Sequence, residues 1–133
     1  MILVDTSVLI DFLQGRDTPA AARLQSLEEE GTPFAVPALC CQEVLQGAKD
    51  EKEWRLLGEY LGSQTVVLPR DPWSTHVAAA RIFFDCRRKG LTIRSSIDCL
   101  IAQLAIEEGA VLLHDDGDFE HIQKVRPLRM LRL

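Results

Sequence analysis

Four acidic residues, Asp5, Glu43, Asp98 and Asp116, lie where an ionised side chain is unexpected. Each ends an apolar run or lies within the apolar pattern of an expected helix, and burying a carboxylate is unfavourable unless it is paired or binds a metal. Four such positions in one small chain suggest a single acidic cluster that forms on folding. Clusters of this kind usually hold divalent cations, and divalent cations on carboxylates usually act on phosphates.

Each of these acids also has an ordinary explanation. Asp5 can be the N-cap of a following helix. In the segment Ser95–Asp98, the aspartate can complete a capping box with Ser95. Glu43 can pair with a lysine or arginine on the flank of its helix. Capping explains Asp116 less well, because three aspartates within four residues repel one another in a confined site. For Asp5, Glu43 and Asp98 the two interpretations stay open.

The elements that must position these acids follow from the apolar pattern. Short continuous apolar runs, typical of strands covered on both faces, alternate with helical patterns bounded by Gly and Pro. Strands are predicted over residues 2–4, 34–36, 65–68 and 110–113, with a last edge strand at 128–131. Helices are predicted from the start of the 8–13 pattern to Gly15, then over residues 18–31, 38–48, 49–61, 72–89, 95–109 and 119–123. This alternation predicts one α/β domain over residues 1–133 with a mainly parallel sheet.

In a parallel sheet, the residues that bind ligands lie at one edge, because ligands bind beyond the carboxyl ends of the strands. Asp5 comes directly after the first predicted strand, and Asp116 and Asp118 come just after the fourth. Asp98 lies in the first turn of its helix, beside the expected buried face. We therefore expect these side chains to meet at one sheet edge, with Asp115 facing solvent.

The bulk composition sets wider limits. The chain has 133 residues and is 47% hydrophobic, enough for one core. It has no apolar run of roughly 18 residues, and its N-terminus lacks the features of a signal peptide, so no membrane span and a cytoplasmic location are expected. The four cysteines form no C-x-x-C pair and are predicted to be free, buried thiols.

Charge and aromatic residues say less about nucleic acid. The net charge of -5 neither indicates nor excludes it, since bound cations would reverse the local field at an acidic site. Arginines and a lysine gather between Arg81 and Arg94, either as a solvated helix face or as a contact stripe for a phosphate backbone. Trp54, Trp73 and Tyr60 are predicted to be packing residues.

Four segments, taken in order, resemble one protein family. The chain opens with ILVDTSVLI over residues 2–10, and Glu43 follows Pro37 in a helix that continues with Val44 and Leu45. Residues 98–102 read D-x-x-I-A, and the last segment, LLHDDGDF over residues 112–119, ends in D-x-D-F. Each motif alone is weak, but together they resemble the PIN-domain nucleases, and most closely the VapC toxins of bacterial toxin–antitoxin pairs.

The resemblance implies a three-layer α/β/α domain that hydrolyses RNA phosphodiesters. It implies that Asp5, Glu43, Asp98 and Asp116 hold Mg²⁺ or Mn²⁺, that Asp118 assists them, and that the Thr6 hydroxyl supports the site. It further implies an RNA substrate, which Arg87, Arg88 and Arg94 are candidates to contact. A VapB-like antitoxin and a homodimer are also implied, with the helices over residues 17–30 and 38–61 as plausible faces.

His114 departs from the family pattern, which usually has Thr or Ser before the last acidic pair. His114 either contacts a phosphate or caps the strand, and we favour the cap.

Two other classes are alternatives. A haloacid dehalogenase-like phosphatase would use Asp5 as nucleophile, but it needs a second aspartate where Ser7 stands. A receiver-like regulatory domain would need its acidic pair after the first strand, where Thr6 and Ser7 follow Asp5 instead.

Overall fold

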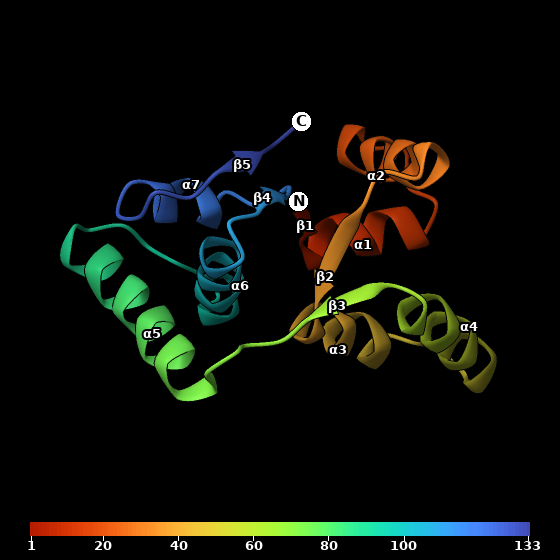
Figure 1. Cartoon of the computed structure of the whole chain (residues 1–133), viewed down its shortest axis with the longest axis horizontal. Helices are drawn as coiled ribbons and strands as arrows, with labels where there is room; N and C mark the ends of the chain where they lie inside the picture. Colours follow the sequence, from red (N-terminus) through yellow and green to blue (C-terminus); the bar gives the residue numbers. More distant parts are fainter.

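The computed structural model describes all 133 residues, which form seven helices and five strands (Figure 1). The strands are β1 (Ile2–Val4), β2 (Phe34–Pro37), β3 (Thr65–Val67), β4 (Val111–Leu113) and β5 (Met130–Leu131). The helices are α1 (Thr6–Leu13), α2 (Pro19–Glu30), α3 (Ala38–Gln46), α4 (Glu51–Gly62), α5 (Pro72–Arg88), α6 (Ser96–Glu107) and α7 (Asp118–Gln123).

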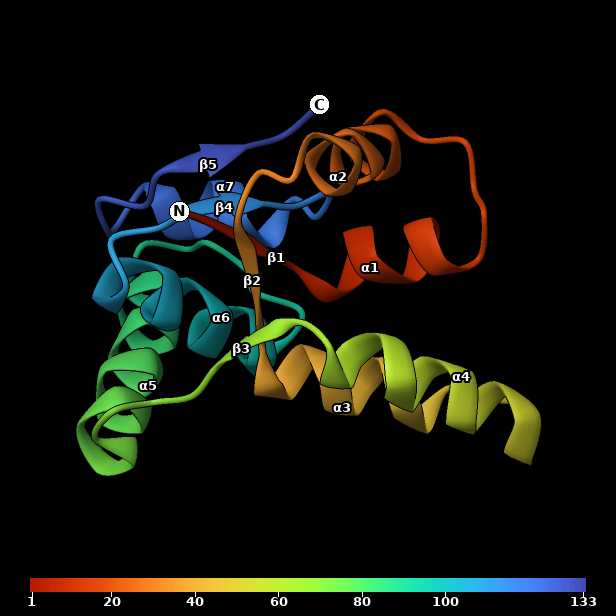
Figure 2. The ribbon, with the colours of Figure 1, turned by 45° about the vertical axis from the view of Figure 1, so that its right-hand side comes forward.

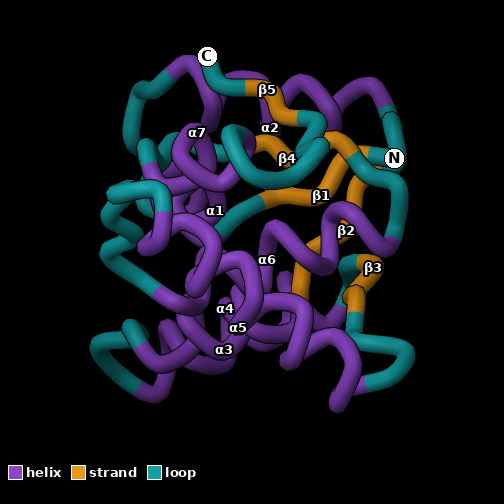
Figure 3. The backbone as a smooth tube through the Cα atoms, turned by 90° about the vertical axis from the view of Figure 1, so that its left-hand side faces the viewer, coloured by secondary structure: helices purple, strands orange, loops and turns teal.

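All five strands are parallel and form one sheet in the order β3-β2-β1-β4-β5. Figure 3 shows them side by side as one layer, from β5 at the top to β3 at the bottom. The first strand of the chain is therefore the central one: Leu3 is paired with Ala35 of β2 on one side and with Leu112 of β4 on the other. The predicted parallel sheet is confirmed, and β5 is parallel as well.

The helices form two layers, one on each side of the sheet. Helix α1 packs on α2 and on α3, and α3 packs on α4, whereas α5, α6 and α7 form a second packed group. Figures 1 and 2 show α5, α6 and α7 on one side of the strands and α1, α2 and α4 on the other. The molecule therefore has the three-layer α/β/α architecture that the resemblance implied.

The core explains why the strands read as unbroken apolar runs. Leu3 and Val4 of β1 are fully buried because helices cover both faces of the sheet. Leu24 of α2 and Ile101 of α6 reach the same core of 28 buried residues from opposite layers. Cys40, Cys86 and Cys99 are buried free thiols, as predicted, and Cys41 is half-buried. None of the helices has both the length and the hydropathy to cross a membrane.

Element boundaries differ from the predictions where a cap decides them. The fourth helix begins at Glu51 rather than at residue 49, because the Asp50 carboxylate accepts the Glu53 N–H at 2.8 Å and acts as N-cap. Gly31 ends α2 in a left-handed conformation with φ 67°, which glycine adopts without strain. The last strand covers only Met130–Leu131, so the predicted strand over 128–131 was too long.

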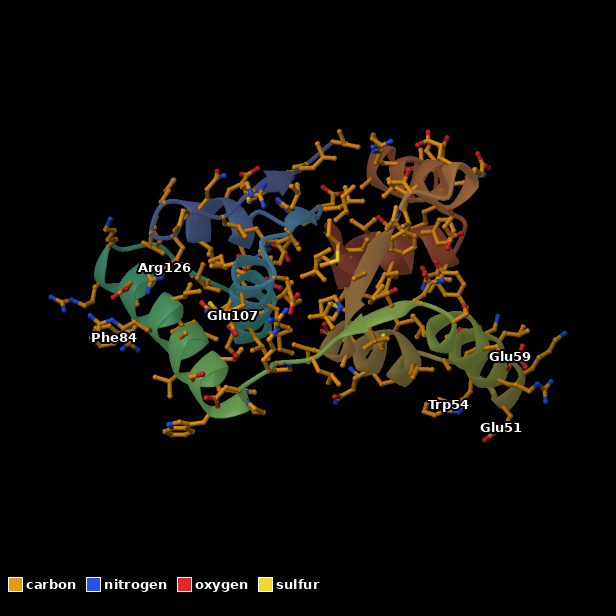
Figure 4. The ribbon with its side chains drawn as sticks, in the orientation of Figure 1. Glu51, Trp54, Glu59, Phe84, Glu107 and Arg126 are labelled. Atoms are coloured by element: carbon orange, nitrogen blue, oxygen red, sulfur yellow. The ribbon has the colours of Figure 1, made fainter.

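The prediction that both tryptophans pack into the protein was wrong. Trp73 is 78% exposed at the start of α5, and Trp54 is 51% exposed on α4, where it points away from the body of the molecule (Figure 4). Tyr60 is half-buried, and its hydroxyl donates to Glu28 of α2, so it ties α4 to α2.

Candidate active site

The site lies where the sheet changes direction. From β1 the chain builds outward through β2 to β3, and it later returns to the other side of β1 as β4 and continues to β5. The carboxyl ends of β1 and β4 thus flank the crevice in which parallel α/β sheets bind ligands. Asp5 follows β1 directly, and its backbone N–H donates to the Leu113 carbonyl of β4 at 3.0 Å.

Asp5 is both an N-cap and a buried member of this edge. Its Oδ2 accepts from the Ser7 hydroxyl at 2.6 Å and from the Ser7 N–H at 3.2 Å, which caps α1. The side chain is nonetheless almost fully buried, and this burial raises its pKa against the lowering effect of the Ser7 hydrogen bonds, with the Asp116 charge raising it further. The capping and site interpretations of Asp5 are therefore compatible.

Ser7 is the residue that the sequence reasoning missed. Its hydroxyl donates to Asp5 and accepts the Asp115 N–H at 3.3 Å, so it links the end of β1 to the loop after β4. A hydroxyl two residues after a strand-end aspartate was the available signal.

Three carboxylates converge beside Asp5. Asp98, Asp116 and Asp118 each offer an oxygen, and these oxygens all lie within 4.8 Å of one another. The capping explanation of Asp98 fails, because the Ser95 side chain caps nothing. Instead Asp98 is only 7% exposed, and its Oδ2 is buried without a hydrogen-bond partner.

The environment of Asp98 makes its negative charge unfavourable. Burial raises its pKa to about 8, and the nearby charges of Asp116 and Asp5 and the carboxyl of Asp118 add to the effect. In the protein without a cation, Asp98 therefore keeps its proton to a higher pH than an ordinary carboxyl does. A carboxyl in this state is a group that a cation would ionise.

Asp118, expected only to assist, lies inside the cluster. Its Oδ2 accepts from the backbone N–H groups of Arg94 at 2.9 Å and Ser95 at 3.3 Å, which fixes the loop before α6. Its own N–H donates to Asp116 Oδ1 at 2.9 Å. The Arg94 guanidinium lies 3.5 Å from Asp116 and 3.6 Å from Asp118.

His114 fixes the backbone of Asp116 through a hydrogen bond. The imidazole is fully buried, packs on Phe119, and accepts the Asp116 N–H through Nδ1 at 3.2 Å. Burial lowers its pKa, so the ring is neutral at pH 7 and Nε2 carries the hydrogen. A fully buried ring does not reach a phosphate, and the arrangement is the strand cap that we favoured.

Glu43 belongs to the other helical layer. It accepts a 2.7 Å hydrogen bond from the Thr6 hydroxyl, which joins α3 to the first turn of α1. Glu43 and Asp5 both lie outside the three-carboxylate group. Glu43 is one of the residues that line a groove of about 750 Å³ between α1, α3 and α4, with Leu13, Leu56 and Leu57 among its apolar residues.

The arginines expected to contact RNA lie in two places. Arg94 touches the acids, whereas Arg87 and Arg88 lie at the end of α5 beside Phe84, with their guanidinium carbons 5.8 and 5.6 Å from its ring centre. Phe84 points outward from α5 (Figure 4). Arg87 and Arg88 form no ion pair, so their charges face solvent uncompensated.

The donor set fits a hard divalent cation. All the converging atoms are carboxylate oxygens, the ligands that Mg²⁺ and Mn²⁺ prefer, and no thiol or imidazole nitrogen points among them. The unpartnered Oδ2 of Asp98 supports this assignment, since a buried carboxylate oxygen normally has a partner. Asp115 is exposed and forms an ion pair with Arg132 outside the cluster.

The chain is similar to known proteins along nearly its whole length. The family model described as "PIN domain" matches residues 2–125. The chain is 37% identical over 130 residues to VapC ribonuclease Mb1587 of Mycobacterium bovis and to Ribonuclease VapC11 of Mycobacterium tuberculosis, covering 97% of this chain and 96% of each relative.

Solved structures show the same fold. VapBC2 from Rickettsia felis, bound to a DNA fragment from its promoter, matches with a TM-score of 0.75 at 18% identity over 100% of this chain and 99% of that one. VapBC-1 from nontypeable Haemophilus influenzae matches with a TM-score of 0.74 at 21% identity over 99% and 98%. The chain therefore belongs to the PIN-domain family and, within it, to the VapC ribonucleases.

Proposed function

We propose that this protein is a divalent-metal-dependent endoribonuclease and the toxin of a toxin–antitoxin pair. The observation that carries the proposal is the convergence of Asp98, Asp116 and Asp118 beside Asp5, with a buried oxygen of Asp98 left unpartnered. The names of its relatives as VapC ribonucleases support the substrate class.

In this proposal Asp5, Asp98 and Asp116 hold Mg²⁺ or Mn²⁺, and Asp118 supplies a further oxygen. A bound divalent cation supplies Lewis acidity, which activates a water molecule and offsets charge on the phosphate. Ser7 and His114 keep Asp5 and Asp116 in place through the hydrogen bonds described above. Glu43, whose carboxylate accepts from the hydroxyl of Thr6 next to Asp5, is proposed as a further metal ligand.

The RNA path is proposed to run from the acids toward the end of α5. Arg87 and Arg88 present unpaired positive charge beside the exposed ring of Phe84, and single-stranded nucleic acid is commonly bound by arginines together with an aromatic face. This cluster is locally basic in a chain whose net charge is -5.

Replacing Asp5 tests the activity. Asp5→Asn keeps the size of the side chain and removes its charge, so we expect metal-dependent cleavage of single-stranded RNA to fall at least about a hundredfold, as for other groups that act on the transition state. The measurement is cleavage rate with Mg²⁺ or Mn²⁺, with circular dichroism as a check of folding. Asp17→Asn, an exposed position outside the site, is the control. Full activity of Asp5→Asn would refute the assignment.

The alternative phosphatase assignment has little support. Ser7 occupies the position where a haloacid dehalogenase-like enzyme needs its second aspartate, and its hydroxyl is engaged between Asp5 and the Asp115 N–H.

Two partners are proposed. The groove between α1, α3 and α4 is lined by apolar residues together with Glu43, and it is proposed to bind an apolar antitoxin segment that carries a basic residue facing Glu43. A second copy is proposed to cover the edge strand β3 and the start of α5, where Leu68 is 65% and Trp73 78% exposed. Helix α2, one of the faces first considered, turns its leucines into the core.

A further inference from the structure

We propose that Arg94 is a built-in counter-ion of the acidic cluster, which competes with the divalent cation and then binds the RNA phosphate once the cation has taken its place. This inference rests on the proposed nuclease function. It gives Arg94 two roles: it pairs with the acids when no metal is bound, and it binds the RNA phosphate when the metal is present.

The contacts of Arg94 single it out. Its Nη2 lies 3.5 Å from Asp116 Oδ1 and its Nε lies 3.6 Å from Asp118 Oδ1. No other lysine, arginine or histidine forms an ion pair with Asp98, Asp116 or Asp118, or with the neighbouring Asp5. The cluster itself is marked as a ligand site by Asp98, which is 7% exposed and has an unpartnered buried oxygen.

The guanidinium is held loosely although its backbone is held firmly. The Arg94 side chain is 76% exposed, and both its ion-pair distances are long. Exposed pairs of this kind contribute little, so the guanidinium can leave at small cost. The loop would stay in place, because the N–H groups of Arg94 and Ser95 bind Asp118 Oδ2 independently of the side chain.

Electrostatic repulsion from a bound cation would move the Arg94 side chain away from the acids. A divalent cation among the carboxylates satisfies Asp116 and Asp118 and repels the neighbouring guanidinium. An arginine released at the rim of a metal site is suited to a phosphate, because its planar fork donates two parallel hydrogen bonds to two oxygens. Arg87 and Arg88 contact neither acid, so they would guide the RNA without competing for the cation.

The test uses Arg94→Gln, with Arg70→Gln as the matched control. Arg70 is also an exposed arginine in a loose ion pair, 3.4 Å from Glu108 and away from the site. Mn²⁺ binding to the metal-free protein is measured by isothermal titration calorimetry. Affinity for a phosphorothioate-stabilised single-stranded RNA is measured by fluorescence anisotropy with saturating Mn²⁺.

We expect opposite changes in the two affinities. Arg94→Gln should bind Mn²⁺ roughly twofold to fivefold more tightly, because an exposed competing ion pair is lost. It should bind the RNA about tenfold more weakly, because a charge-assisted contact to phosphate is lost. Arg70→Gln should change neither. Arg94→Lys should keep the Mn²⁺ affinity near wild type and still weaken RNA binding, and it serves as the second variant if the glutamine variant does not fold.

Unchanged or weaker Mn²⁺ affinity in Arg94→Gln would overturn the inference, as would unchanged RNA affinity. These outcomes are separable from failure of the nuclease proposal, because that failure would appear in the wild type as an absence of metal-dependent RNA cleavage.

Discussion

At the residue scale, Asp98 determines how the site responds to pH. It faces the charges of Asp5, Asp116 and Asp118, with Arg94 at the rim, and burial raises its pKa to about 8 from an ordinary 3.8. The folded state therefore binds a proton more tightly than the unfolded chain does. Stability from this group is complete below the unfolded pKa and is lost as the pH rises through about 8.

We therefore expect the metal-free protein to lose stability between pH 5 and 8. The melting temperature in EDTA should fall as the pH rises across this range. Adding Mn²⁺ should raise the melting temperature more at pH 8 than at pH 5, because cation binding has to displace the Asp98 proton. Differential scanning fluorimetry at several pH values measures both effects. Asp98→Asn should flatten the dependence, and an equally steep fall in that variant would assign it to other groups.

The sequence predicted these residues unevenly. Asp5 and Asp116 were placed correctly at the sheet edge because strand ends are readable from apolar runs. The sequence did not predict that Arg94 contacts two acids. This contact depends on the position of the loop backbone, which Asp118 fixes by accepting hydrogen bonds from two N–H groups. The roles of Ser7 and His114 are equally local matters of hydrogen-bond geometry.

At the element scale, the site is assembled from both helical layers. Asp98 comes from α6 on one side of the sheet, Glu43 from α3 on the other, and Asp5 from the junction between the central strand β1 and α1. The Thr6–Glu43 hydrogen bond is the direct link that fixes α3 to the start of α1. The order of elements was predictable from periodicity, whereas this link was not predicted, since the family resemblance implied only that the Thr6 hydroxyl supports the site.

Removing this link should affect activity more than folding. Thr6→Val keeps the shape of the side chain and leaves the Glu43 carboxylate free to move, and a lost hydrogen bond to a charged group corresponds to about tenfold in kcat/KM. Steady-state RNA cleavage with saturating Mn²⁺ measures the effect. Thr6→Ser keeps the hydroxyl and should retain most of the activity. If the serine variant lost as much as the valine variant, the hydrogen bond would not be the cause.

At the scale of the whole molecule, two apolar surfaces remain for partners. One is the groove with Leu56 on its wall, and the other runs from Leu68 to Trp73 and Val77. The sequence did not reveal the second surface, because a tryptophan in a helical pattern reads as core. Only the placement of α5 at the edge of the molecule shows that Trp73 faces outward.

A matched pair of variants separates the two surfaces. Trp73→Ser should convert a homodimer to monomer by light scattering while leaving antitoxin capture unchanged. Leu56→Ser should weaken antitoxin capture in co-purification while leaving the dimer mass unchanged, so each variant is the control for the other. A dimer that survives Trp73→Ser, or undiminished capture by Leu56→Ser, would place that partner elsewhere.

The central position of β1 also determines when the sheet and the acidic cluster can form during synthesis of the chain. The first strand made needs β4 as a neighbour, and Asp5 is tied to Leu113, near the end of the chain. The acids contributed by α6 and by the loop after β4 are synthesised long after Asp5, and Asp118 is the first residue of α7. A nascent chain therefore cannot assemble the acidic cluster until residue 118 has been made, and such closure is slow because the contacts are distant in sequence. The order of the elements therefore separates in time the synthesis of Asp5 from that of Asp98, Asp116 and Asp118, which must all be present before the acidic cluster can form.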